Sequence, residues 1–303
     1  MLIACANACS RAWHIRIEHA ARARCFDCAE HRAMDDLVLR IIIFAIVGLV
    51  SGFLSGLFGI GGSTVRLPIF IYLFPWVGIE HSILMHVASA TSMALVIPSA
   101  ITASREQYAL GNLDFGFYKT WVVGLFIGVA FGAILLPYSS TEILQSLFAV
   151  YILLVGLYIA VGRGRALSAG QPPSGIKRIG LGSFVGLVAA MTGTSGGTLT
   201  TPLLNTCGLA LEKAIAIASA TGLVTGSIAT IGGIITGWNA RDLPSYSLGY
   251  VDVVIFIVMM PTVMISAPLG VYVGNKFSQT MLERTYAALL ILVGADLLWR
   301  LAS

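Results

Sequence analysis

Charged side chains are scarce in this sequence. Asp, Glu, Lys and Arg make up 11% of its 303 residues, whereas soluble domains contain about 25%. Hydrophobic residues make up 57%, and the mean hydropathy is +0.89. A soluble protein with so few charged residues could not keep this much apolar surface away from water. Lipid must therefore cover that surface. The composition excludes an ordinary soluble fold and predicts an all-α, polytopic membrane protein.

The sequence also lacks a concentrated basic surface. Its formal net charge is +4, six of its 14 Arg residues fall within the first 40 positions, and the others are scattered or lie in loops. A protein that binds nucleic acid would gather basic residues into a stripe that neutralises phosphates. We therefore expect no nucleic-acid partner.

Cysteine is nearly absent from the apolar body, which contains only Cys207. The N-terminal segment has no hydrophobic periodicity, and no apolar core of a signal peptide follows its arginines. We interpret residues 1–33 as a non-native or disordered extension, with translation starting at Met34, and we expect no cofactor or metal. A zinc site is the alternative, because the segment contains a Cys-x-x-Cys pair among Cys5, Cys9, His14, His19, Cys25, Cys28 and His31.

Eight apolar stretches are predicted to cross the bilayer, for which a helix needs about 20 residues. They lie at 37–58, 81–104, 115–137, 141–162, 179–193, 211–236, 249–275 and 280–301. Residues 163–178 interrupt this pattern with charge, Pro and Gly and form the linker between a first transmembrane repeat, 37–162, and a second, 179–302.

The two halves share an ordered series of residues. At an offset of 130, the Ala-Ser-Ala-Thr segment at 88–91 matches that at 218–221. An apolar composition does not by itself produce ordered Gly, Thr and Pro matches, so we infer a duplication. At an offset of 134, the matched pairs are Gly52 with Gly186, Gly59 with Gly193, Gly62 with Gly196, Thr64 with Thr198 and Pro68 with Pro202.

The distribution of positive charge predicts the orientation. The linker contains Arg163, Arg165, Lys177 and Arg178, whereas the loop at 138–141 contains no Lys or Arg. The positive-inside rule places the linker in the cytoplasm, and four spans per half place both termini there. Five spans per half would instead make the repeats inverted. We expect the protein to lie in a bacterial inner (cell) membrane. The sequence leaves open whether it forms a homo-oligomer.

A Gly-rich break interrupts each half at the corresponding position. Half-length apolar pieces follow, at 64–74 and 198–205. Non-helical backbone at membrane depth must be buried or line a cavity, and the start of the next helix carries unpaired N–H groups and positive charge that suit an anion. Paired breaks indicate a transporter's substrate site; the alternative is close helix packing with helix caps. The candidate ligands are Gly59, Gly61, Gly62, Ser63, Thr64, Thr194, Ser195, Gly196, Gly197 and Thr198.

Further candidates lie outside the breaks. Arg66 follows the first break and is either a counter-charge for the anion or a side chain that extends to the interface. His86 either binds substrate or relays protons, or it only bonds a backbone carbonyl. The hydroxyls of Ser89, Thr91, Ser219 and Thr221 either line the same cavity or join neighbouring helices.

Asp114 and Asp252 stand at the starts of predicted spans. A carboxylate is favourable at the N-terminus of a helix, where it accepts hydrogen bonds from unpaired backbone N–H groups. We predict that both side chains are structural.

The segments LSGLFGIGGSTVRLP in the first half and VAAMTGTSGGTLTTP in the second, with the two Ala-Ser-Ala-Thr segments, resemble the TauE/SafE family of sulfite exporters. The resemblance covers about residues 37–300. It implies eight spans made by duplication of four, and a small sulfur anion such as sulfite or a sulfonate as substrate. The family's glycine motif maps onto Gly59, Gly61 and Gly62, but Ser63 stands where many members have a third Gly.

We therefore expect a secondary transporter, not an enzyme, that exports a small organosulfur or inorganic anion. A monoanion leaving a cell that is negative inside gains about 2.3 kcal/mol per 100 mV, and no P-loop pattern for nucleotide binding is present. Gly-x-Ser-Gly at 193–196 resembles the rhomboid protease motif, but no His follows His86 to activate Ser195. A membrane scaffold or sensor is the remaining alternative.

Overall fold

The computed structural model describes residues 19–58, 62–161, 172–240, 243–244, 246–274 and 279–302. The chain divides by contacts into two units, Met1–Phe44 and Ala45–Ser303. Of the first unit, the structure describes the N-terminal part of helix α2, which begins at His19. All the elements below, with the C-terminal part of α2, belong to the second unit.

The described residues are almost entirely helical, which confirms the predicted all-α class. The elements, in chain order, are α2 (His19–Phe58), α3 (Ser63–Val77), α4 (His81–Ala109), α5 (Phe115–Leu135), η1 (Leu136–Tyr138), α6 (Thr141–Ala160), α7 (Gly175–Thr192), α8 (Gly197–Thr206), α9 (Leu211–Gly237), β1 (Ser247–Leu248), β2 (Val251–Asp252), α10 (Val253–Gly274) and α11 (Gln279–Ala302).

Seven helices in the described part of the chain are long and apolar enough to cross a membrane. They confirm a polytopic membrane protein. The predicted span at 280–301 coincides with α11, a continuous helix of 24 residues, but α11 is not among the seven. A total of eight spans stays a prediction. The seven are Val38–Leu57, His81–Ala109, Phe115–Tyr138, Thr141–Ala160, Gly175–Thr192, Glu212–Gly237 and Val253–Gly270.

Three predicted spans start at other residues in the structure. The first helix begins at His19, ahead of position 37, and α7 begins at Gly175, inside the predicted linker. The span expected from residue 249 begins only at Val253, because strands β1 and β2 form a short antiparallel hairpin. Gly249 makes its turn with φ +58°, a left-handed conformation that glycine adopts without strain.

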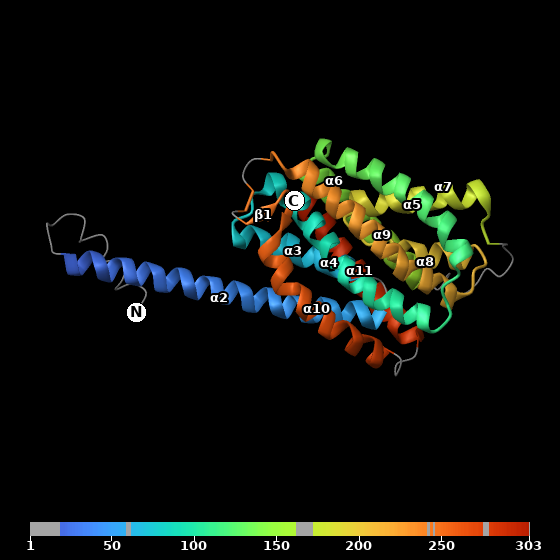
Figure 1. The fold of residues 1–303 in the computed structure, drawn as a ribbon, viewed down its shortest axis with the longest axis horizontal. Helices are drawn as coiled ribbons and strands as arrows, with labels where there is room; N and C mark the ends of the chain where they lie inside the picture. The colour runs from blue at the N-terminus through green and yellow to red at the C-terminus, as the bar shows by residue number, and fades with distance from the viewer. Residues whose placement is uncertain are drawn as a thin grey trace. The chain divides into compact units, whose positions relative to one another are not determined.

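Helices α5 and α7 lie side by side at backbone contact (Figure 1). A Cβ added to Gly182 would lie 2.8 Å from the carbonyl oxygen of Trp121, and one on Gly186 would lie 2.6 Å from that of Leu125. Gly128 packs in the same way against Ser183. Small residues permit this close approach in lipid, where no hydrophobic effect drives helices together.

The C-terminal part of α2 makes the corresponding contact with α10. A Cβ on Gly52 would lie 2.8 Å from the Cα atom of Val263, and Gly270 packs against the backbone of Phe53. Gly52 and Gly186 are a matched pair at the offset of 134. The first helix of each half thus packs against a later helix of the other half, and the duplication stays a prediction.

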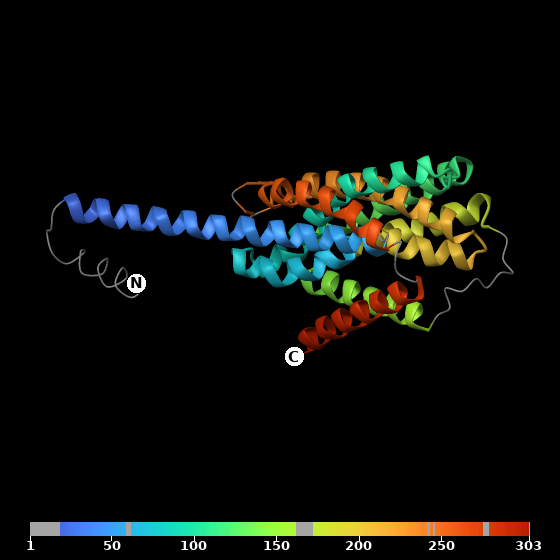
Figure 2. The same ribbon diagram turned by 90° about the horizontal axis from the view of Figure 1, so that it is seen from below.

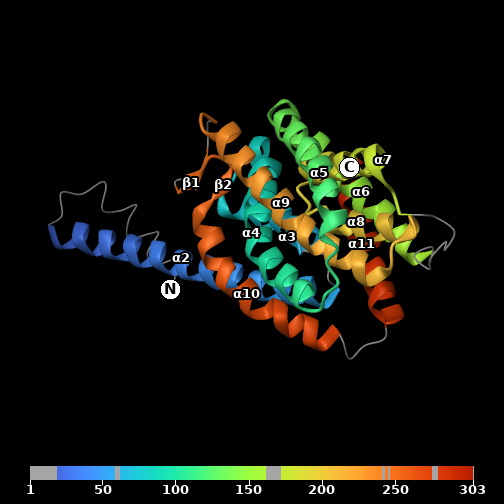
Figure 3. The same ribbon diagram turned by 45° about the vertical axis from the view of Figure 1, so that its right-hand side comes forward.

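Repeat-related helices also pair with one another. Helix α4 lies beside α9 (Figure 3) and α6 beside α11 (Figure 2). In the second pair, a Cβ on Gly156 would lie 3.0 Å from the Cβ atom of Leu290, and one on Gly294 would lie 3.1 Å from that of Leu153. Each half therefore supplies one member of both pairs.

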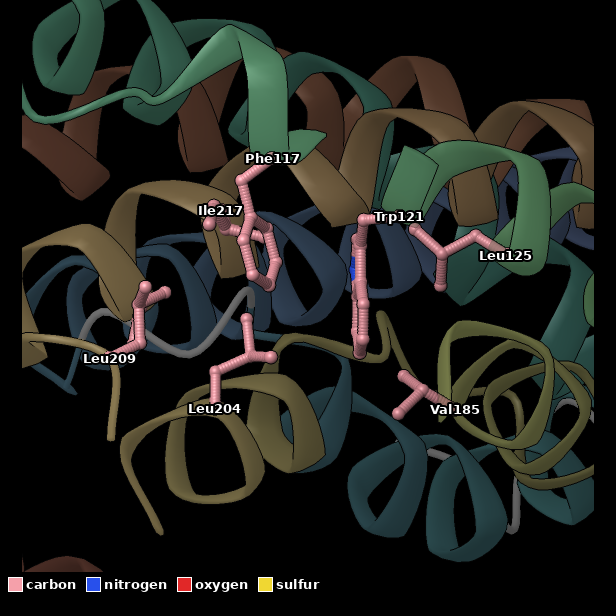
Figure 4. Close-up of a cluster of buried hydrophobic side chains, with 8 residues drawn as sticks. Phe117, Trp121, Leu125, Val185, Leu204, Leu209 and Ile217 are labelled. Carbon is pink, nitrogen blue, oxygen red and sulfur yellow. The ribbon is translucent and has the colours of Figure 1, made fainter. Parts of the chain in front are cut away.

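A buried apolar cluster anchors the half-helix α8 (Figure 4). The rings of Phe117 and Trp121 lie next to each other, with centroids 6.3 Å apart, and Leu204 of α8 packs into the same cluster. The Trp121 indole N–H donates to the hydroxyl of Thr221 on α9 at 3.1 Å. A fully buried Trp held by packing and by a hydrogen bond fixes the half-helix relative to α5 and α9.

Candidate functional site

Both half-helices begin at a glycine in the left-handed region. Gly62 has φ 66° and ψ −17° and precedes α3; Gly196 has φ 71° and ψ −19° and precedes α8. A residue with a Cβ rarely adopts this conformation. The carbonyl of each glycine accepts backbone N–H groups from the residues three and four positions later. The two breaks are therefore folded in the same way.

The N-termini of the two half-helices meet. The hydroxyl oxygens of Thr64 and Thr198 lie 2.9 Å apart, within hydrogen-bond distance. The backbone N–H of Ser195 donates to the hydroxyl oxygen of Ser63 at 2.8 Å. All four residues are buried. The structure thus joins the two breaks, which are remote in sequence, at one point inside the protein.

Arg66 is fully buried one turn into α3. Its Nε donates to the carbonyl oxygen of Gly62 at 3.3 Å, so the guanidinium turns back toward the break. This geometry does not fit a side chain that extends to the membrane interface. Its repeat mate, Thr200, likewise donates from its hydroxyl to the carbonyl oxygen of Gly196, at 2.8 Å.

The second break has further hydroxyl neighbours. Thr225 on α9 donates to the carbonyl oxygen of Ser195 at 2.8 Å. The hydroxyls of Thr192 and Thr194 lie 3.0 Å apart. Ser89 packs so closely against Gly193 that a Cβ there would collide with it, and its own hydroxyl has no hydrogen-bond partner among the described residues.

Two tyrosines face the same junction from helices outside the half-helices. The hydroxyl of Tyr151 on α6 faces those of Thr194 and Thr198. The hydroxyl of Tyr286 on α11 faces those of Thr64 and Thr198. Both tyrosines are buried. The junction is therefore surrounded by hydroxyl groups from four helical elements.

The structure does not bring every predicted site residue to the junction. Thr91 accepts the backbone N–H of Asp252 at 3.0 Å, and Thr221 accepts the Trp121 indole N–H. Ser219 bonds its own helix, at the carbonyl oxygen of Ile215. Thr91 and Thr221 therefore join neighbouring elements, which is the alternative that the sequence left open, whereas Ser219 bonds only within its own helix.

His86 also lies apart from the hydroxyl cluster. Its Nε2 is 3.1 Å from the carbonyl oxygen of Leu136, and its ring lies 5.0 Å from that of Tyr250. The bond to a backbone carbonyl is the structural alternative stated for this residue. Gly59 and Gly61, like Cys5, Cys9 and His14 of the zinc alternative, lie outside the described residues.

The two predicted aspartate caps are confirmed. A side-chain oxygen of Asp114 accepts the backbone N–H of Phe117 at 3.0 Å, and one of Asp252 accepts that of Ile255 at 3.0 Å. Burial raises the pKa of Asp252, and its hydrogen bonds from backbone N–H groups act in the opposite direction. Both carboxylates hold the starts of helices.

The sequence reasoning missed Tyr151, Tyr286, Thr192 and Thr225. No motif marked Tyr151, Tyr286 and Thr225, which lie within apolar helices away from the glycine motifs. Thr192, in contrast, stands directly before Gly193, inside the second motif segment. A polar group in such a helix must find a protein partner or a ligand. The need for a partner could have marked these residues as candidates, but the sequence does not reveal which neighbour each side chain faces.

The electrostatics of the junction favour an anion. Two helix N-termini supply partial positive charge and N–H groups without intrahelical partners. Among the residues whose side chains are described, Arg66 is the one buried Lys or Arg. Hydroxyl groups are hydrogen-bond donors as well as acceptors, although Thr192 and Thr225 already donate to the backbone carbonyls of Val188 and Ser195. The arrangement can replace the hydration shell of a small oxyanion.

Comparison with known proteins gives consistent matches. The family model described as sulfite exporter TauE/SafE matches residues 44–297. A "Probable membrane transporter protein" of Haemophilus influenzae is 26% identical over 259 residues, which cover 85% of this chain and 97% of that protein. One from Methanocaldococcus jannaschii is 24% identical over 265 residues, 87% of this chain and 97% of that protein. No solved structure matches the chain significantly.

Proposed function

This chain belongs to the sulfite exporter TauE/SafE family and is a multi-pass membrane transporter, and we propose that it carries a small sulfur oxyanion that binds where its two half-helices meet. Sulfite, a sulfonate or a related organosulfur anion is the proposed substrate. Transport is secondary, without nucleotide hydrolysis, and no catalytic step is involved.

One observation carries this proposal: the Thr64 and Thr198 hydroxyls lie 2.9 Å apart at the N-termini of α3 and α8. Two helices that approach each other N-terminus to N-terminus bring like partial charges together, which is unfavourable unless an anion lies between or beside them. The buried guanidinium of Arg66, which turns toward the same end of α3, adds to this positive potential.

The number of positive charges favours a singly charged substrate. Arg66 is the one buried Lys or Arg among the residues whose side chains are described, and it balances one negative charge. A second charge would be buried with only dipoles to stabilise it, which is costly in a medium of low dielectric constant. The site therefore favours a monoanion, such as a sulfonate or hydrogensulfite, over a dianion such as sulfate.

The proposed direction is export. In a membrane that is negative inside, a monoanion gains about 2.3 kcal/mol per 100 mV on leaving, so a uniporter needs no other energy source. The positive charge of the linker supports cytoplasmic termini, and the proposed location is a bacterial inner membrane.

A binding panel on purified protein tests the proposal. Methanesulfonate, sulfite, thiosulfate, sulfate and acetate are added, and the thermal shift is measured at constant ionic strength. We expect methanesulfonate and sulfite to raise the melting temperature and sulfate to do so less. The absence of a saturable shift with any sulfur anion would overturn the proposed substrate class.

Flux in proteoliposomes then tests transport and its direction. An imposed potential, negative on the side of the substrate, should accelerate methanesulfonate flux out of that compartment, and reversing its sign should slow it. Flux that ignores the potential would refute electrogenic export, whereas binding without flux would favour a scaffold or sensor.

A further inference from the structure

Tyr151 of α6 carries a buried hydroxyl that the fold does not satisfy. Its side chain is 8% exposed, and its hydroxyl has no hydrogen-bond partner among the described residues. A buried polar group without a partner destabilises the folded state, and the few such groups in proteins need an explanation. A phenylalanine at this position would fill nearly the same space without that penalty.

The direction of this hydroxyl indicates what it binds. Its polar neighbours are the hydroxyls of Thr194, in the second break, and Thr198, in the first turn of α8: both are near enough to act on it electrostatically, but neither meets the geometry of a hydrogen bond. Thr198 is also the residue that meets Thr64 of the other half-helix, at 2.9 Å. The Tyr151 hydroxyl thus faces the junction from a third helix, at the N-terminal end of α8.

We propose that Tyr151 is an anion-binding residue: its hydroxyl donates a hydrogen bond to an oxygen of the transported anion at the junction of the half-helices. This inference rests on the proposed function and names a contact outside the glycine motifs. A bound oxyanion supplies an acceptor in hydrogen-bond geometry, which none of the described residues supplies to this hydroxyl.

The contact also narrows the substrate class. Tyr151 adds a neutral O–H donor beside the hydroxyl pair of Thr64 and Thr198, and directional O–H bonds suit an anion with several oxygens. They stabilise negative charge without adding a full positive charge to the site. A sulfonate group, with one charge and several acceptor oxygens, fits a site that combines one buried guanidinium with neutral O–H donors.

The substitution Tyr151→Phe tests the proposal, with Tyr118→Phe as the matched control. The Tyr118 hydroxyl donates to the carbonyl oxygen of Ala220 at 2.8 Å, so it has a structural partner. Melting temperatures without ligand and affinities for methanesulfonate are measured for full-length protein in detergent.

For Tyr151→Phe we expect an unchanged or higher melting temperature without ligand, because an unsatisfied hydroxyl is removed. The affinity for methanesulfonate should fall about tenfold or more, the usual effect of losing a hydrogen bond to a charged group. Tyr118→Phe should show the opposite pattern, a lower melting temperature with affinity within about twofold.

The outcomes separate the two proposals. If the wild type binds methanesulfonate and Tyr151→Phe binds it equally well, the role of Tyr151 is wrong and the proposed function stands. A lower melting temperature in Tyr151→Phe with unchanged affinity would show that Tyr151 has a structural role. This result would also reject the role of Tyr151 in binding and leave the proposed function standing. If the wild type binds no sulfur anion at all, both proposals fail.

Discussion

The hydroxyl oxygens of Thr64 and Thr198 lie 2.9 Å apart although 134 residues separate them in the chain. The two residues are repeat mates, each in the first turn of a half-helix. Neither half of the sequence can form this contact alone. The proposed site is therefore a property of the folded pair of halves.

The Thr64–Thr198 contact predicts energetic coupling. Thr64→Val or Thr198→Val leaves the other hydroxyl buried without this partner, which costs about 1–3 kcal/mol. The double variant removes both groups, so it should lose less than the sum of the single losses, by at least about 0.5 kcal/mol. Unfolding of all four proteins in detergent gives the coupling energy.

Thr236→Val is the control for this cycle, because the Thr236 hydroxyl donates to the carbonyl oxygen of Gly232 in its own helix at 2.7 Å. Its effect should add to that of Thr64→Val. Strict additivity between Thr64→Val and Thr198→Val would show that the two hydroxyls do not interact.

The capping glycines predict graded losses of stability. Alanine at Gly62 or Gly196 would take a left-handed conformation, which costs about 1–2 kcal/mol. At Gly62 a Cβ would also lie 2.7 Å from the Cβ atom of Ser55, whereas at Gly196 the nearest atoms are at 3.3 Å. We expect Gly62→Ala to lower the melting temperature more than Gly196→Ala.

Gly111→Ala measures the cost of the left-handed backbone conformation alone, because Gly111 has φ +71° and nothing lies within 4 Å of its added Cβ. This variant should lose stability by the strain alone and keep anion affinity. If Gly62→Ala loses no more stability and no more anion affinity than Gly111→Ala, the close packing around the first break contributes to neither.

Arg66 is predicted to set the affinity for the anion. Arg66→Gln removes the buried positive charge, and the affinity for methanesulfonate should fall about tenfold to a hundredfold, as expected for a lost charge-assisted hydrogen bond. Arg66→Lys keeps the charge without the planar guanidinium and should give an intermediate value. Titration calorimetry in detergent measures all three proteins.

Arg300→Gln is the control for charge, because Arg300 lies in an exposed pair with Asp296, at 3.1 Å. Its affinity should stay within about twofold of the wild type, since exposed ion pairs contribute little. Equal losses in Arg66→Gln and Arg300→Gln would mean that only the net charge matters.

Asp252 predicts a pH dependence of stability. Burial raises the pKa of this carboxyl above its ordinary value of 3.8, so the folded protein binds the proton more tightly than the unfolded chain. Its contribution to the free energy of unfolding therefore increases as the pH falls through the folded pKa. Asp252→Asn keeps a capping side chain but cannot titrate.

The melting temperature of the wild type minus that of Asp252→Asn should therefore rise as the pH is lowered from neutral to about 4. A series of thermal melts in detergent across this range measures it. A difference that stays constant, or that falls on acidification, would contradict the raised pKa.

The sequence was sufficient for the class of fold and for the location of the breaks. Apolar runs of about 20 residues in lipid have few alternatives to a helix, and Gly62 and Gly196 mark backbone that a Cβ would strain. Asp114 and Asp252 were read correctly as caps, because a carboxylate satisfies the unpaired N–H groups of a helix start.

The sequence was less informative about tertiary contacts. Ser89 and Thr91 stand two positions apart in one matched segment, yet Ser89 packs against Gly193 and Thr91 bonds Asp252. Positions two apart point to different sides of a helix, and the pattern does not say which side faces the break. Tyr151 was missed for the same reason.

The glycine contacts between α5 and α7 restrict how the protein can move. Gly182 and Gly186 bring α7 to within backbone contact of α5, so sliding one helix past the other meets steric resistance from main-chain atoms. The C-terminal part of α2 and α10 are held together in the same manner by Gly52 and Gly270. A helix pair that moves as one body therefore combines helices from both halves of the chain.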